Sequence, residues 1–448
     1  MASNVLKAPA SSGWLYHPQF PAYWRHRPLY SMATWVNGIA FRDIQFAPTG
    51  RPVIKIAEIK GGISGQTKFT QQTFDDSVFV RPGDLLFSWS GQPETSIDVF
   101  WWRGPEGWLN QHIFRVTPVD GIDAVFLYYL LRYLKPNFVG IARNKQTTGL
   151  GHITKRDMEN LEVAHPDIAE QRAIAYILGT LDDKIELNRR MSATLETMAR
   201  VLFKSWFVDF DPVRAKAEGR DPGLPADLAA LFPDRLVETT EGEVPEGWRY
   251  ESLTAVFDIN PPRSLTRGEM APYLDMANMP TSGHFPDDVV ERPFGSGMKF
   301  RNGDTLVARI TPCLENGKTA FVDFLDEGQV GWGSTEYIVL RPRPPWPDEA
   351  AYLVARDEGF REFAIQSMTG TSGRQRVPAA ALDHFRLVIP NDPILRAFGA
   401  AVRPWFQRSS AALRQSRTLA TLRDALLPKL ISGELRVPDA EACLDRIR

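Results

Sequence analysis

The sequence repeats itself once, and the spacing between matching positions is constant at half of its 448 residues. The matching pairs of positions are Trp24 and Trp248, Trp108 and Trp332, Gly149 and Gly373, Pro166 and Pro390, and Leu195 and Leu419. Chance among common residues does not explain five pairs with one spacing, two of them tryptophans. We therefore expect two copies of one structural unit, because a fixed internal period is typical of repeated architecture.

Each copy is predicted to begin with a β-rich domain and to end with one long helix. Gly-Asp pairs at residues 83–84 and 303–304 are each followed by an apolar run. This pattern is typical of a turn that leads into a buried strand. The long helical segments follow Pro166 and Pro390 in the two copies.

The first long helix is predicted over roughly Ile168–Lys204, which gives about 55 Å at ~1.5 Å per residue. Its apolar residues recur at spacings of mostly three and four, as in a coiled coil. Asn188 lies among them, where a polar residue can fix the register of paired helices. In the second helix, Pro404 is expected to kink or interrupt the first turns. The two helices most simply pack on each other; the alternative is two separate core helices.

These patterns predict an α+β fold. Two tandem-repeated β-rich domains are separated by two long antiparallel, coiled-coil-like helices with pseudo-twofold symmetry. Residues Ser205–Pro245 contain nine acidic and four basic residues and several prolines, a composition typical of a connector. The expected segments are the first domain (1–166), the first helix (167–207), the connector (208–244), the second domain (245–390), the second helix (391–436) and the C-terminal tail (437–448).

Composition excludes several classes of protein. Hydrophobic residues make up 43% and charged residues 24%, as in ordinary globular domains. The longest apolar run, Ala124–Leu131, is shorter than the ~18 residues of a membrane span, and the N-terminus shows no signal-peptide pattern. Cys313 and Cys443 are too few for a disulfide framework or a cysteine zinc site and fit a cytoplasmic location. The net charge of −2 gives no overall sign of nucleic-acid binding.

Short sequences that resemble catalytic motifs are all incomplete. Asn260 begins an Asn-Pro-Pro sequence like that of amino-methyltransferases, but Arg263 replaces the required aromatic residue. Residues 316–319 resemble the end of a phosphate-binding loop, but Pro312 stands in place of its first glycine. Asp209-Phe-Asp211 lies in the connector, and the seven histidines form no His-Glu-x-x-His pair. We therefore expect no catalytic residue and no metal site in this chain.

Two polar, glycine-containing loops occupy matching positions, at residues 143–152 and 366–376. Their cationic and amide side chains suit phosphates and base edges, and glycine permits close approach. Most such loops are merely exposed to solvent, but the repetition favours a function. These loops and the ends of two predicted strands supply the candidate DNA-binding residues. They are Ser88, Trp89, Ser90, Arg143, Lys145, Gln146, Thr147, Thr148, Arg309, Ser372, Arg374, Gln375 and Arg376. The second unit is acidic overall, so DNA binding there would need a local basic patch or a partner.

The helical segments resemble those of a known family. Residues 170–191, which begin Glu-Gln-Arg, and residues 195–212, which end Asp-Phe-Asp-Pro, resemble the first conserved helix of type I restriction–modification specificity subunits. Residues 422–435 resemble the end of the second conserved helix. Glu170 and Gln171 have no counterpart in the second helix, so the two docking surfaces are not expected to be strictly equivalent.

This resemblance implies a non-catalytic DNA specificity subunit. Each β-rich domain would be a target recognition domain that reads one half of a bipartite site in double-stranded DNA. The helices would set the gap and dock two modification (methyltransferase) subunits, which restriction subunits would join. S-adenosylmethionine, ATP and magnesium are expected on those partner subunits, and no cofactor is expected in this chain.

The candidate partner-docking residues lie near the ends of the two helices. They are Leu202, Phe203, Trp206, Phe207, Leu427 and Leu430. The alternative places all of them in the core of the chain itself. Two other functions stay open at this point: a duplicated protein scaffold that does not read DNA, and a self-contained DNA methyltransferase.

Overall fold

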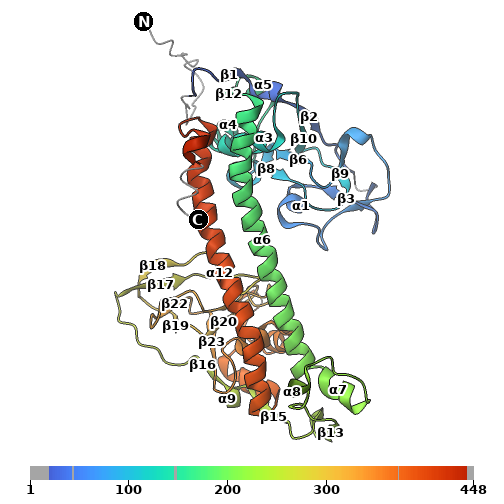
Figure 1. Ribbon diagram of the computed structural model, residues 1–448, viewed down its shortest axis with the longest axis vertical. Helices are drawn as coiled ribbons and strands as arrows, with labels where there is room; N and C mark the ends of the chain where they lie inside the picture. The colour runs from blue at the N-terminus through green and yellow to red at the C-terminus, as the bar shows by residue number, and fades with distance from the viewer. Residues whose placement is uncertain (1–19, 43–44, 146–148, 372, 441–448) are drawn as a thin grey trace. The chain divides into compact units, whose positions relative to one another are not determined.

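The computed structural model describes residues 20–42, 45–145, 149–371 and 373–440. These residues form two compact units. The first unit combines the residues up to Lys184 with those from Leu419 onward, and the second unit comprises Ile185–Thr418. Two 40-residue helices, α6 (Ile168–Phe207) and α12 (Asp392–Ile431), contribute to both units (Figure 1).

The β-rich domain of the first unit contains two four-stranded sheets, with strand orders β2-β10-β6-β8 and β4-β3-β9-β5. Two short antiparallel pairs, β1-β12 and β7-β11, accompany them. The strands are β1 (Arg25–Pro28), β2 (Ala33–Asn37), β3 (Arg51–Ile54), β4 (Phe69–Thr70), β5 (Phe79–Val80), β6 (Leu85–Ser88), β7 (Ser90–Gly91), β8 (Asp98–Trp101), β9 (Gly107–Leu109), β10 (Ile113–Pro118), β11 (Gly151–His152) and β12 (Glu162–His165). The helices are η1 (Leu29–Met32), α1 (Ile56–Gly61), η3 (Asp76–Val78), α2 (Pro93–Ser96), α3 (Ala124–Tyr133), α4 (Lys135–Asn144) and α5 (Lys155–Glu159).

The second unit contains sheets of order β16-β23-β20-β21 and β18-β17-β22-β19, with the pairs β13-β14 and β15-β24. The strands are β13 (Leu236–Thr239), β14 (Gly242–Pro245), β15 (Arg249–Ser252), β16 (Phe257–Ile259), β17 (Met270–Leu274), β18 (Val290–Pro293), β19 (Met298–Phe300), β20 (Thr305–Ala308), β21 (Thr319–Phe321), β22 (Gly331–Gly333), β23 (Tyr337–Pro342) and β24 (Arg386–Ile389). The helices are α7 (Asp211–Ala217), α8 (Ala226–Ala229), α9 (Leu253–Val256), α10 (Ala350–Arg356), α11 (Glu358–Gln366) and η4 (Ala379–His384).

The two β-rich domains share one topology, which confirms the predicted α+β fold and its duplication. In each domain, one sheet contains a parallel strand pair with a tryptophan at the same place. Val53 in β3 is opposite Trp108 in β9, and Tyr273 in β17 is opposite Trp332 in β22. Antiparallel strands flank both parallel pairs. The repeat spacing found in the sequence therefore relates positions with the same role in the two sheets.

The Gly-Asp turns before the buried strands β6 and β20 also match. Gly83 and Gly303 have φ angles of 94° and 86°, in the region that glycine adopts without a steric penalty. In both turns the aspartate carboxylate accepts a hydrogen bond from a backbone amide three residues earlier, at 2.7 Å and 2.8 Å. The sequence pattern thus produces the same turn twice.

The two long helices pack antiparallel around a polar contact within the second unit. The Asn188 side-chain amide donates hydrogen bonds to the carbonyl of Ala412 at 3.2 Å and to Oε1 of Gln415 at 2.9 Å. Asn188 and Ala412 are 224 residues apart, so they are equivalent positions of the repeat. In an antiparallel pair, equivalent residues meet only where the local twofold axis crosses the helices. Contrary to the expectation, Pro404 does not interrupt α12. Its missing N–H leaves the carbonyl of Ala400 without a helical hydrogen bond, and Ala400 is exposed.

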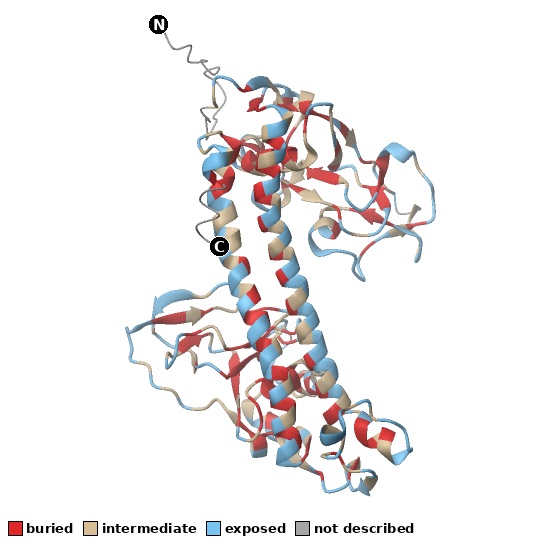
Figure 2. Ribbon diagram, in the orientation of Figure 1, coloured by how far each residue is buried: buried red, intermediate tan, exposed pale blue. Residues whose placement is uncertain are grey.

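Each β-rich domain builds its core against parts of both long helices. In the first unit, side chains of α3 pack with Leu178 and Leu181 of α6 and with Leu430 of α12. In the second unit, Phe203 of α6 and Phe398 of α12 join one aromatic cluster. Buried and exposed residues consequently alternate along both helices (Figure 2).

The segment predicted as an acidic connector is folded. It forms α7, α8 and the hairpin β13-β14, whose strands pair from Leu236 to Pro245. Phe210, Val213 and Phe232 are buried in the second core. The Trp206 ring packs edge-on against Phe232, with ring centroids 5.0 Å apart. The prolines and charged residues of this segment suggested a connector, but the apolar residues between them are part of the core.

We expect Trp206→Ala to destabilise the second unit strongly. Trp206 is only 2% exposed, and removing a buried tryptophan leaves a cavity that costs about 3–5 kcal/mol. Val201→Ala is the control, because Val201 is 62% exposed on the same helix and should change stability by less than about 0.5 kcal/mol. Denaturant-induced unfolding measures both values, and similar small changes for the two variants would contradict this packing.

Candidate nucleic-acid interface

In the second unit, the end of strand β20 is joined to the second polar loop. Ile310 and Arg376 form an isolated antiparallel bridge. The Thr311 amide donates to the Gln375 carbonyl at 3.1 Å, and the Gln375 amide donates to Oγ1 of Thr311 at 3.2 Å. The sequence predicted Arg309 and this loop as separate candidates, and the structure brings them together.

Arginines gather around one carboxylate at this place. Arg376 donates from Nε to Oε1 of Glu336 at 2.9 Å and from Nη2 at 2.7 Å. These hydrogen bonds hold the pKa of Glu336 below its usual value. The backbone amide of Arg309 donates to the Glu336 carbonyl at 3.0 Å, and the buried Nε of Arg309 has no hydrogen-bond partner among the described residues. Arg374 is exposed beside them.

The first unit repeats this arrangement with different side chains. Ser90 in β7 is opposite His152 in β11, and the Ile153 amide donates to the Trp89 carbonyl at 2.8 Å. The indole Nε1 of Trp89 donates to Oδ1 of Asn37 at 2.9 Å. Trp89 follows β6 directly, just as Arg309 follows β20. The same strand end therefore presents an indole in one unit and a guanidinium in the other.

Two predicted cations of the first loop have acidic partners in the chain. Arg143 Nε lies 2.5 Å from Oε1 of Glu94, and Lys145 Nζ lies 2.5 Å from Oδ2 of Asp157. Burial alone would raise the pKa of Asp157, but the hydrogen bonds from Lys145 and Thr154 lower it overall. A phosphate would have to displace these carboxylates. The candidates Gln146, Thr147, Thr148 and Ser372 lie outside the described residues.

Ser88 does not belong to an exposed surface. It ends β6 with no exposed area, and its hydroxyl has no hydrogen-bond partner in the described structure. A strand in the middle of a sheet alternates its side chains between two faces, but both faces of β6 are covered here. The prediction that Ser88 contacts DNA is therefore corrected.

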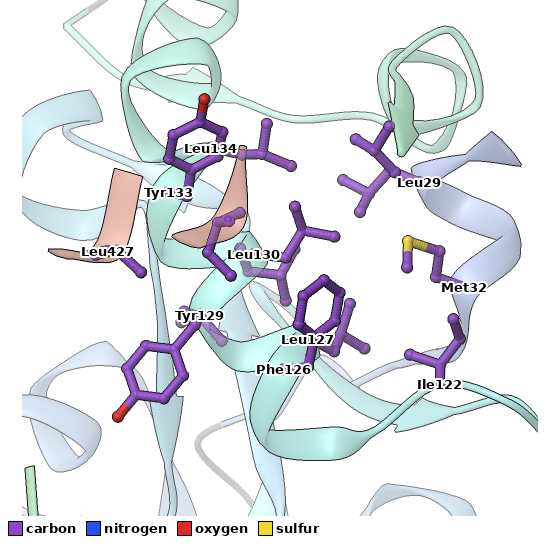
Figure 3. Close-up of a cluster of buried hydrophobic side chains, with 14 of the residues drawn as sticks. Leu29, Met32, Ile122, Phe126, Leu127, Tyr129, Leu130, Tyr133, Leu134 and Leu427 are labelled. Carbon is purple, nitrogen blue, oxygen red and sulfur yellow. The ribbon is translucent and has the colours of Figure 1, made fainter. Parts of the chain in front are cut away.

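The candidate docking side chains are mostly buried within the chain. Phe203, Trp206 and Phe207 belong to the core of the second unit, and Leu430 is fully buried in the first. Leu427 lies in the same buried cluster as Tyr129 and Leu130 of α3 (Figure 3). Only Leu202 is half-buried. The prediction that this set faces a partner is corrected, because the β-rich domains and the folded connector already cover it.

A different apolar face of α6 is exposed, which the sequence analysis missed. Tyr176, Leu187 and Met198 follow one another at intervals of eleven residues, and Val201 lies one turn beyond Met198; all four are exposed. Eleven residues are close to three helical turns, so these side chains share one face. The interval of eleven residues can be found in the sequence, but the apolar residues that are buried on the same helix show a stronger periodicity.

The described residues contain no group of three or more His, Cys, Asp or Glu side chains that could hold a metal ion. Asn260, the residue of the incomplete methyltransferase motif, has a φ of 52°, and its Oδ1 accepts a hydrogen bond from the Val339 amide at 2.9 Å. It therefore has a structural role at the end of β16. No helix in the described part of the chain is long and apolar enough to cross a membrane.

Comparisons with known proteins agree with this architecture. Residues 22–197 match the model of the type I restriction modification DNA specificity domain. The MjaIX specificity subunit of Methanocaldococcus jannaschii is 23% identical over 90% of this chain and 98% of its own length. The HindI specificity subunit of Haemophilus influenzae is 25% identical over 70% of this chain and 77% of its own.

A solved structure shows the same fold. The S subunit of a type I restriction–modification system from M. genitalium superposes with a TM-score of 0.54 at 14% identity, covering 93% of this chain and 99% of that one. Over most of its length the chain is similar to type I restriction–modification specificity subunits, and residues 22–197 match their DNA specificity domain.

Proposed function

We propose that this chain is the DNA specificity subunit of a type I restriction–modification complex, with each β-rich domain reading one half of a bipartite site. The observation that carries the proposal is the repeated interface, in which one strand end and one polar loop are joined in both units. The relatives that this chain resembles are named specificity subunits, and the chain would likewise be a non-catalytic component of the complex. Methyl transfer, with S-adenosylmethionine, and ATP-dependent restriction, with magnesium, would belong to partner subunits.

The chemistry of the second interface suits DNA. Arginine can donate two hydrogen bonds to a guanine edge or pair with a phosphate. Arg309 and Arg374 have no carboxylate bonded to their guanidinium groups among the described contacts, whereas Arg376 is held by Glu336. An internally paired arginine is oriented but partly neutralised. Arg309 and Arg374 are therefore the stronger candidates for base or phosphate contacts.

The long helices would set the gap between the half-sites and bind the modification subunits. Forty residues of helix span about 60 Å at ~1.5 Å per residue. The exposed face of Leu187, Met198 and Val201 on α6 is the docking surface that we propose, since apolar patches on a surface mark interaction sites. Positions 411 and 425 of α12, which correspond to Leu187 and Val201, are alanines. The two pseudo-equivalent faces thus offer unequal apolar area.

Co-expression of the chain with its modification partner tests the proposed function. Mapping the methylated bases across a genome should give two short sequences separated by a constant gap. A partner-free chain should transfer no methyl group from S-adenosylmethionine. Methylation by the isolated chain would support a self-contained methyltransferase, and assembly with the partner without site-specific methylation would support a scaffold that does not read DNA.

Substitutions at the second interface should affect one half-site only. Arg309→Ala or Arg374→Ala is expected to lower discrimination at one position by about 5- to 150-fold, corresponding to ~1–3 kcal/mol for a base contact. Arg267→Ala, an exposed arginine before β17, is the matched control. Methylation of a library with both half-sites randomised measures the effect. Equal relaxation of both half-sites would contradict modular reading, and a uniform loss at all sequences would identify a phosphate contact.

A charge on the exposed face of α6 should weaken complex assembly. Val201→Asp places a carboxylate in the proposed docking surface, and we expect the affinity for the modification subunit to fall at least about tenfold, because an unpaired charge would be buried in an apolar contact. Ala193→Asp adds the same charge to another exposed face of the helix and should leave assembly unchanged. Titration of purified subunits measures both, and thermal unfolding should be unaltered. Equal effects of the two variants would argue against this surface.

A further inference from the structure

A buried polar cluster ties the second β-rich domain to both long helices. His284, which is 1% exposed, and Asp323 lie in loops of the domain, and Tyr352 lies in α10. Glu196 comes from α6 and Ser410 from α12. Polar groups in such a position must satisfy one another, because an unpaired buried group is costly.

The centre of the cluster is the carboxylate of Glu196. The Tyr352 hydroxyl donates to its Oε1 at 2.6 Å, and Nδ1 of His284 lies 3.6 Å from its Oε2. Burial alone would raise the pKa of Glu196, but the neighbouring His284 ring and the hydrogen bond from Tyr352 lower it overall. The carboxylate is thus held in its charged form by side chains of the β-rich domain.

The contact to α12 passes through Ser410. Its hydroxyl donates to the carboxylate of Asp323 and therefore accepts from Nε2 of His284, which is 2.9 Å away. The His284 ring consequently connects a carboxylate on α6 with a hydroxyl on α12. A series of hydrogen-bonded side chains of this kind fixes the orientation of the β-rich domain on the helices as well as its distance from them, because each hydrogen bond has an angular requirement.

Arg356 extends the cluster to the loops of the domain. Its Nε donates to the Tyr352 hydroxyl at 3.0 Å. Its two terminal nitrogens donate to four backbone carbonyls, those of Thr281, Gly283, Gly317 and Thr319, at 2.6–3.1 Å. The amide of Ala308 donates to the carbonyl of Lys318 at 3.0 Å. Arg309, the candidate DNA contact, is thus one residue from a strand pair that Arg356 anchors.

The first unit contains a related contact. Tyr128 and Arg132 are the repeat equivalents of Tyr352 and Arg356, at the same half-length spacing as the other matching pairs. Arg132 Nη1 lies 4.0 Å from Oδ2 of Asp182 on α6, and the hydroxyl of the adjacent Tyr129 donates to the same oxygen at 2.7 Å. In the first unit, Tyr129 and Arg132 of α3 meet the carboxylate of Asp182. In the second unit, Tyr352 of α10 meets the carboxylate of Glu196, and Arg356 binds the hydroxyl of Tyr352.

We propose that the chain of contacts Glu196–Tyr352–Arg356 is a positioning device that determines how strictly the gap between the half-sites is measured. The proposal rests on the proposed function. Neighbouring base pairs are ~3.4 Å apart along the duplex, so a second domain that shifts on its helices by a few ångströms would accept a neighbouring gap. Tyr352 and Glu196 would act through Arg356 and would touch no DNA themselves.

Tyr352→Phe and Glu196→Gln test the device in the complex with the modification subunit. The readout is the ratio of methylation at the preferred gap to methylation at gaps one base pair shorter and longer. Each variant is expected to lower this ratio about tenfold, in line with one lost hydrogen bond to a charged group. Tyr23→Phe, which removes the hydroxyl of an exposed tyrosine, is the matched control and should leave the ratio unchanged.

The double variant separates positioning from general destabilisation. Because the two residues act through one contact, Tyr352→Phe combined with Glu196→Gln should lower the ratio no further than either change alone. An unchanged ratio, or a uniform loss of methylation with the gap preference intact, would overturn the proposal. The unaltered chain is measured first, in its complex with the modification subunit. If this complex showed no site-specific methylation at two half-sites with a constant gap, the proposed function itself would be refuted.

Discussion

The architecture depends on the antiparallel contact between α6 and α12. Within the second unit, Asn188 of α6 binds the backbone of Ala412, its own equivalent in the repeat. A buried asparagine amide has few alternative partners in an apolar interface, so this contact selects one register of the helices. Each β-rich domain then completes its core with side chains from both helices. Neither core would form in this way if the register shifted.

The duplication and the long helices were predictable because both depend on spacing. A repeat distance of half the chain and an apolar period that alternates between three and four are properties of the sequence itself. The parallel strand pairs at Trp108 and Trp332 confirm the repeat. The paired Gly-Asp turns were also predictable, because a turn with positive φ needs glycine at a defined place.

The roles of individual side chains were less accessible. Trp206 lies on the same helix as Val201, yet the first is buried and the second exposed. The difference arises from Phe232 of the folded connector and Phe398 of α12, whose ring centroids lie 5.0 Å and 5.8 Å from that of Trp206. Likewise, Lys145 is paired with Asp157 through tertiary folding. Helical periodicity identifies an apolar face, but it does not identify the element that covers this face.

The two units retain their supporting contacts and differ at the positions that face outward. A Tyr-x-x-x-Arg sequence begins at Tyr128 in one unit and at Tyr352 in the other. Its Arg132 faces a carboxylate of α6 in the first unit, and its Tyr352 does so in the second. The residue after the central buried strand differs, with Trp89 in one unit and Arg309 in the other. The single N–H of the Trp89 indole is bound to Asn37, whereas a guanidinium carries five N–H donors. Under the proposed function, a framework of this kind would permit a change in the recognised sequence without a change in the helices that hold the two domains.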